Sequence, residues 1–226
     1  HVMNRGLENR NIFLNDKHRK LFLHLLSEIS ERFQVDIHSY CLMDNHYHLL
    51  LQTQLPNLNL VMKHLSGIYT VKFNRDIKRD GPLFRGRYKS ILIDKDSYLL
   101  NVSRYIHKNP STAKLTDNDQ NYTWSSYQYY HLNKHKKPKW LVINEVLNYF
   151  NGDSKNYVAF VEKGSDENIN KFYSSQKLKS ILGSKSFIKE ISSKFFKKIP
   201  GKHLSNRDQI ITARFPSLKE IFLIII

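Results

Sequence analysis

Two histidines separated by a single residue, His46 and His48, have the spacing of a metal site. Alternate side chains of a β-strand point to the same face, so a strand here would place both imidazoles on one side and Tyr47 on the other. Two imidazoles one pleat apart can ligate one divalent metal ion. Because the chain has 11 histidines among 226 residues, chance readily produces such a pair, and the interpretation depends on its position directly after a predicted Asp44-Asn45 turn.

A second chemical pattern lies further along the chain, where the cations Arg85, Arg87 and Lys89 alternate with Phe84 and Tyr88. Cations interleaved with aromatic rings along a strand suit a phosphate backbone and stacked, unpaired bases. A solvated edge strand protected by charge has the same residue types. These residues alone leave both interpretations open, and the positive charge of the whole chain favours DNA binding by Arg85, Arg87, Tyr88 and Lys89.

The charge balance of the chain is strongly basic. Lysine and arginine number 36 against 20 aspartates and glutamates, a net charge of +16, and the pI is near 9.8. This surplus favours a polyanionic partner, either nucleic acid or an anionic membrane surface, although a generally basic protein would show it too. No apolar run approaches the roughly 18 residues of a membrane span. The single cysteine, Cys41, excludes an intramolecular disulfide and fits a reducing, cytoplasmic compartment.

The elements that must position these residues follow from their periodicity. Apolar residues at helical spacing, among them Phe22, Leu25 and Ile29, predict an amphipathic helix. Strand formers on both sides of the 44–45 turn predict a β-hairpin. The expected order is a strand at 1–5, a helix ending near 33, strands at 35–43 and 46–52, a helix at 58–75, a strand at 88–93 and a helix ending at 109–110.

This βαββαβ order predicts an α+β fold of the ferredoxin-like, split-βαβ type, which RRM domains share. Such a fold packs helices on one face of an antiparallel sheet and leaves the other face available for a partner. Composition then divides the chain into a first domain over 1–132, a basic linker at 133–139 and an α-helical C-terminal extension over 140–226. We expect the extension to contact DNA or to cover the sheet, with no catalytic part. Its short helices are predicted near 142–150, 157–162, 185–196 and 206–215.

The hairpin sequence MDNHYHLLL at 43–51 resembles the HUH block (His, bulky apolar residue, His) of the single-tyrosine HUH transposases, and the series of motifs most resembles the REP-associated tyrosine transposases. The resemblance continues in collinear order over about residues 1–130. The other segments that carry it are HVMNRG at 1–6, Tyr69 followed by FNR at 73–75, GPLFRGRYKS at 81–90, YIHKNP at 105–110 and WSSY at 124–127.

The resemblance implies a mechanism. Enzymes of this family cleave single-stranded DNA with a tyrosine nucleophile and leave a 5′-phosphotyrosine and a free 3′-OH. It implies that His46 and His48 hold Mg²⁺ or Mn²⁺, and that the protein is prokaryotic and associated with the nucleoid. Because the phosphotyrosine conserves the energy of the phosphodiester, the strand can be rejoined without ATP.

The resemblance also implies which tyrosine attacks. Tyr69 matches the family position, although Met62, Leu65, Tyr69 and Phe73 also share a helical stripe typical of a core. Tyr88 and Tyr105 would be the next to examine. Related enzymes often have a third metal ligand, an asparagine or glutamine, one turn after the tyrosine. Here that position is Phe73, which cannot ligate, so the weaker candidate is the next residue along the chain, Asn74.

The function predicted from these features is a metal-dependent transposase that nicks and rejoins single-stranded or hairpin-bearing DNA. One alternative is a domesticated relative that binds structured single strands without efficient strand transfer. Another is an RRM-like RNA-binding module, which would need aromatic rings at stacking positions on its central strands, where His46 and His48 stand instead. Both a homodimer and a monomer are compatible with the sequence.

Overall fold

The computed structural model describes residues 1–131, 136–164, 166–175 and 177–195. At its centre is a four-stranded antiparallel sheet with the strand order β2-β3-β1-β4. This is the order of a split-βαβ fold, in which β1 and β3 are the inner strands, and it confirms the predicted fold class. The strands are β1 (Val2–Arg5), β2 (Val35–Leu42), β3 (His46–Thr53) and β4 (Lys89–Ser90).

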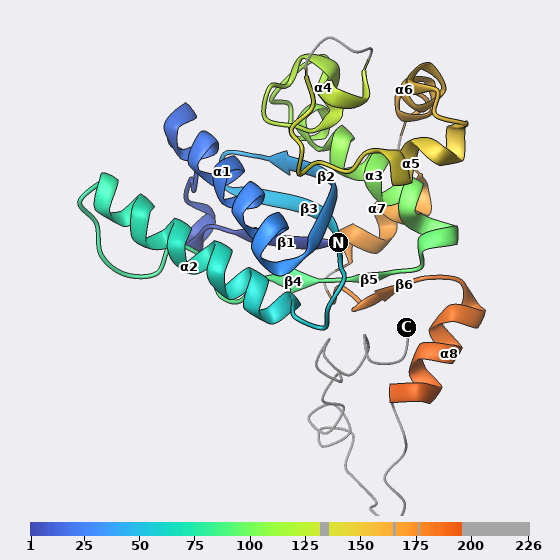
Figure 1. Cartoon of the computed structure of the whole chain (residues 1–226), viewed down its shortest axis with the longest axis horizontal. Coiled ribbons are helices and arrows are strands. Elements are labelled where there is room, and N and C mark those ends of the chain that lie inside the picture. The colour runs from blue at the N-terminus through green and yellow to red at the C-terminus, as the bar shows by residue number, and fades with distance from the viewer. Residues whose placement is uncertain (132–135, 165, 176, 196–226) are drawn as a thin grey trace, which may run out of the picture.

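Two helices, α1 (Asp16–Phe33) and α2 (Leu58–Asp76), lie side by side across one face of the sheet (Figure 1). Helix α1 begins where the side chain of Asn15 accepts a hydrogen bond from the backbone nitrogen of His18, which satisfies one of the free donors of the first turn. Its buried stripe reaches the sheet through Phe22, whose ring centroid is 4.8 Å from that of Tyr47. Tyr47 therefore marks the face that α1 and α2 cover.

The opposite face of the sheet carries α3 (Lys95–Thr112) and is not open, as the sequence had led us to expect. The Ser103 hydroxyl of this helix lies 2.8 Å from the Ser39 hydroxyl of β2. Leu99, Val102 and Ile106 form its buried apolar stripe. An apolar stripe on a helix is stabilised when another element shields it from water, and here the second face of the sheet does so.

Two boundaries differ from those predicted. The expected strand at 88–93 is divided, because β5 (Leu92–Ile93) leaves the main sheet and pairs in parallel with β6 (Ile181–Leu182) of the C-terminal extension. Helix α3 continues past Pro110 to Thr112, since a proline in the last turn removes few hydrogen bonds.

The C-terminal extension is built of short helices and packs against the first domain. Its Ser184 hydroxyl and backbone nitrogen both donate to the Asp94 carboxylate, at 2.9 and 3.0 Å. The helix predicted at 206–215 and part of the predicted linker lie outside the described residues. The remaining helices of the described chain are η1 (Leu7–Asn9), η2 (Asp119–Asn121), α4 (Tyr127–Tyr130), α5 (Asn144–Leu147), η3 (Asn148–Phe150), α6 (Ser154–Glu162), α7 (Glu167–Ser174) and α8 (Lys185–Phe195).

A buried polar network joins the extension to α3. The two ring nitrogens of His107 lie 2.7 Å from the Tyr157 hydroxyl and 2.8 Å from the Ser126 hydroxyl. Tyr157 also lies 2.7 Å from the Ser103 hydroxyl. Burial lowers the pKa of His107 to about 3, so the imidazole is neutral in the folded protein.

This neutral histidine should make the protein less stable in mild acid. In the unfolded chain the pKa of His107 is near 6.5. Below that pH the unfolded state therefore binds a proton that the folded state does not bind. The stabilisation is complete above pH 6.5 and falls by about 2 kcal/mol at pH 5. Urea unfolding between pH 7.5 and 5 checks this, and a His107→Gln variant should show a flatter pH dependence. An equal slope in both proteins would contradict the assignment.

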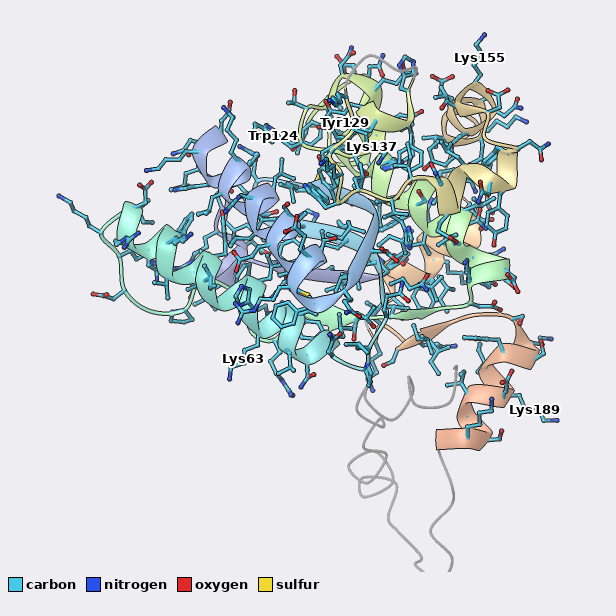
Figure 2. All side chains as sticks on the ribbon, viewed as in Figure 1. Lys63, Trp124, Tyr129, Lys137, Lys155 and Lys189 are labelled. Carbon is cyan, nitrogen blue, oxygen red and sulfur yellow. The ribbon has the colours of Figure 1, made fainter. Side chains whose placement is uncertain are left out.

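Many cations of the described residues lie at the surface. Figure 2 shows Lys63, Lys155 and Lys189 extending away from the ribbon, and all three are exposed. In the described part of the chain, none of the helices combines the length and apolar character needed to cross a membrane.

Candidate active site

The two histidines of β3 share one face of the sheet, as the spacing predicted. Their ring centroids are 5.1 Å apart, and Tyr47 between them points into the core under α1. The pairing of β3 with β1 sets His46 opposite Arg5 and His48 opposite Met3. His48 is 5 % exposed, whereas His46 is less deeply buried.

Each of these imidazoles is oriented by a partner at its Nδ1 atom. His46 Nδ1 lies 2.7 Å from Asn45 Oδ1, and an amide oxygen only accepts, so Nδ1 carries the proton and Nε2 keeps its lone pair. His48 Nδ1 lies 2.9 Å from His1 Nε2. Among the described residues, neither Nε2 atom of the pair has a hydrogen-bond partner. This is the arrangement of ligating histidines, in which the second nitrogen fixes the ring and its tautomer.

Both histidines are kept neutral. Burial lowers the pKa of His46, and the nearby Asp44 carboxylate opposes this only in part. Burial lowers the pKa of His48 well below its usual value, and His46 lowers it further. A neutral imidazole has the lone pair that a metal ion needs, so the pair is ready to ligate at neutral pH.

The histidines open onto a cleft of roughly 820 Å³. The cations Arg85, Arg87 and Lys89 line it and are called its basic wall here. Side chains of α3, of α7 and of the segment after α7 line it as well. The residues that line the cleft are Met3, Asn4, Arg5, Asn9, Asn45, His46, His48, Arg85, Gly86, Arg87, Lys89, Tyr105, Asn109, Tyr173, Ser175 and Leu178.

Helix α3 presents a tyrosine to this cleft. The ring centroid of Tyr105 is 5.7 Å from that of His48. Burial raises the pKa of Tyr105, while a side-chain hydrogen bond with Asn109 acts in the opposite direction. Asn109 stands one helical turn later and lines the same cleft. The structure therefore brings together a pair of histidines, a phenol and a side-chain amide.

The structure does not bring Tyr69 to the histidines. Tyr69 is fully buried on the opposite face of the sheet, 5.1 Å between ring centroids from Phe22, and its hydroxyl donates to the Ile12 carbonyl at 2.5 Å. Burial raises the pKa of Tyr69 above its usual value. The helical stripe that includes Tyr69 is core, which was the alternative interpretation of that stripe.

Asn74 and the basic segment are also placed by the structure. Asn74 donates to the Gly81 carbonyl at 2.8 Å and accepts from Arg79 at 3.3 Å, so its amide is engaged at the end of α2. Arg85 and Arg87 are exposed in an irregular segment that precedes β4, not along a strand as predicted. Two hydrogen bonds tie this segment to β1: the Arg85 backbone nitrogen donates to the Arg5 carbonyl at 3.0 Å, and Asn4 Nδ2 donates to the Gly86 carbonyl at 3.2 Å.

Sequence reasoning did not select His1, Asn109 or Tyr173 as site residues. Asn109 and Tyr173 line the cleft, and His1 contacts His48. A signal for Asn109 was present in the segment YIHKNP, where an asparagine stands one turn after a tyrosine. His1 and Tyr173 carry no local pattern, because their role depends on contacts between segments far apart in the chain.

The donor atoms of the cleft fit a divalent cation. The described residues contain no group of three or more histidine, cysteine, aspartate or glutamate side chains suited to a metal. His46, His48 and the Asn109 amide oxygen instead offer two imidazoles and one oxygen. Mn²⁺ accepts such a mixed set, and Mg²⁺ prefers the oxygens that a DNA phosphate and water would add.

Comparison with known proteins shows what the N-terminal part of the chain is similar to. Residues 1–109 match the family model described as IS200-like transposases. No curated protein matches the chain. A solved structure of a REP-associated tyrosine transposase bound to a REP hairpin has a TM-score of 0.47 and 13% sequence identity, covering 62% of this chain and 84% of that one. The match of residues 1–109 to this family model confirms the resemblance to transposases that the sequence motifs indicated.

Proposed function

We propose that the protein nicks and rejoins single-stranded or hairpin-bearing DNA in a metal-dependent reaction with a 5′-phosphotyrosine intermediate. The observation that carries the proposal is the position of Tyr105 beside His48 in a cleft with a basic wall. The match of residues 1–109 to the IS200-like transposase model supports the same chemistry.

Tyr105 is the nucleophile in this proposal, in place of Tyr69. Its ring shares the cleft with both histidines, whereas the Tyr69 hydroxyl is held by the Ile12 carbonyl in the core. The family pattern of an asparagine or glutamine one turn after the nucleophile fails at Phe73 but is met at Asn109. Asn109 therefore replaces Asn74 as the proposed third ligand.

Catalysis divides between the metal and the side chains. A Mg²⁺ or Mn²⁺ ion held by His46, His48 and Asn109 would act as a Lewis acid on the scissile phosphate. The chain orients the phenol for attack: Tyr105 Oη forms a bond to phosphorus as the bond from phosphorus to the 3′ oxygen breaks. The phenol proton ends on that oxygen, so the products are a 5′-phosphotyrosine and a free 3′-OH. Reversal of these steps reseals the strand.

The basic wall gives the cleft its affinity for a polyanion. Arg85, Arg87 and Lys89 are exposed beside the histidines and can pair with successive phosphates of an unpaired strand. Tyr88 is half-buried next to them, and its packed ring is suited to supporting the segment as well as to contacting a base.

The experiment that tests this proposal is capture of the covalent intermediate. Hairpin-bearing oligonucleotides labelled at the 3′ end should give a labelled protein band that survives denaturation, because the 5′-phosphotyrosine retains the downstream strand. The band should require Mn²⁺ or Mg²⁺, disappear when the metal is chelated and return when it is added back. Tight hairpin binding without any adduct would overturn the proposal and favour a domesticated binding protein.

A further inference from the structure

Tyr173 belongs to α7 of the C-terminal extension yet lies in the cleft of the first domain. Its position is fixed by its own helix. The Asp166 side chain accepts hydrogen bonds from the backbone nitrogens of Asn168 and Ile169 at the start of α7, at 2.9 and 3.3 Å. Ile169 is buried. A capped helix with a buried anchor holds the tyrosine one turn later at a defined place.

The first contact of Tyr173 leads to a proposed metal ligand. The Tyr173 hydroxyl lies 2.6 Å from His1 Nδ1, and His1 Nε2 lies 2.9 Å from His48 Nδ1. If His48 Nδ1 donates to His1, then His1 Nε2 accepts and His1 Nδ1 donates to the tyrosine oxygen. Metal ligation by His48 Nε2 requires this order of donors, in which the phenol oxygen accepts from His1 and the His48 Nε2 lone pair faces the cleft.

The second contact of Tyr173 is with the proposed nucleophile. The rings of Tyr105 and Tyr173 are stacked, with centroids 4.0 Å apart and an interplanar angle of 13°. His1 packs edge-on against both rings, at 6.1 Å from Tyr105 and 5.2 Å from Tyr173. Aromatic pairs of this kind restrict the rotation of each ring. Tyr173 thus contacts the proposed nucleophile Tyr105 directly and is linked to the proposed metal ligand His48 through His1.

We propose that Tyr173 is a positioning residue through which the C-terminal extension completes the active site. It orients His48 through His1 and holds the ring of Tyr105 by stacking. The inference rests on the proposed function, since it assumes that His48 ligates metal and that Tyr105 attacks. It also revises our expectation that the extension has no catalytic part.

Two substitutions separate the two contacts. Tyr173→Phe removes the hydroxyl that bonds His1 and keeps the stacked ring, so Mn²⁺ affinity measured by calorimetry should fall about ten-fold. Adduct formation at saturating Mn²⁺ should stay near the wild-type rate. Tyr173→Leu removes the ring as well, so that rate should also fall, by roughly ten-fold. The matched control is Tyr149→Phe, an exposed tyrosine of the same extension, which should change neither quantity.

A readout independent of activity comes from NMR of the metal-free protein. In the wild type, ¹⁵N shifts should report His48 protonated at Nδ1, and Tyr173→Phe should show a mixture of tautomers. Unchanged Mn²⁺ affinity and an unchanged tautomer in Tyr173→Phe would overturn the inference while leaving the proposed function intact. A wild-type protein that neither binds Mn²⁺ nor forms an adduct would overturn both.

Discussion

Tyr105→Phe should abolish the covalent DNA adduct and leave binding of hairpin DNA and metal nearly unchanged. The substitution removes the hydroxyl oxygen that attacks phosphorus. The other tyrosine that lines the cleft is Tyr173, and its hydroxyl is engaged with His1. Loss of a nucleophile typically lowers turnover by orders of magnitude, so we expect cleavage to fall at least about a thousand-fold. Gel assays of strand cleavage and of the labelled protein measure both effects.

The matched control for this experiment is Tyr69→Phe. It removes the same atom from a tyrosine on the other face of the sheet, so the adduct should persist. Its effect should be on stability instead, because the buried Ile12 carbonyl loses its donor at a cost of about 1–3 kcal/mol. An adduct that survives in Tyr105→Phe and vanishes in Tyr69→Phe would restore Tyr69 as the nucleophile.

His48→Ala should remove metal-dependent cleavage more completely than any change at Tyr173. Loss of a partner that merely orients a ligand costs 10- to 100-fold in metal affinity or activity, so loss of the ligand itself should cost more than about 100-fold. His46→Ala should behave in the same way, because both Nε2 atoms are proposed ligands. Mn²⁺ titration and cleavage at several metal concentrations provide the measurement.

His24→Ala is a suitable control for the metal experiment, since His24 is exposed on α1. It should retain wild-type metal affinity and cleavage. Circular dichroism should show that the His46 and His48 variants remain folded. Wild-type cleavage in a folded His48→Ala protein would exclude the metal assignment, whatever the behaviour of Tyr105.

The sheet and the shared face of its two histidines were predictable because they depend on local periodicity. A strand alternates its side chains whatever it packs against, so His46 and His48 had to share a face once 46–52 was a strand. The helical stripe of α1 and the turn before β3 likewise come from neighbouring residues. These features led to the correct fold class, because few topologies accommodate βαββαβ.

The choice of tyrosine could not be predicted in the same way. A stripe that includes Tyr69 shows that one side of α2 is buried, but the sequence does not say which face of the sheet will cover it. Tyr105 also stands on a helix with a buried stripe, and only the packing of α3 on the second face brings it to His48. The resemblance favoured Tyr69 as the nucleophile, whereas the packing favours Tyr105.

The sequence by itself determined the elements, their order and the shared face of His46 and His48, since each follows from interactions between residues close in the chain. Only the tertiary structure decided which phenol meets those histidines and that the extension contributes Tyr173. The physical reason is the distance along the chain: His1, His48, Tyr105 and Tyr173 come from four separate segments. Burial of the apolar stripe of α3 and of Ile169 on α7 brings them together, and no local pattern records that packing.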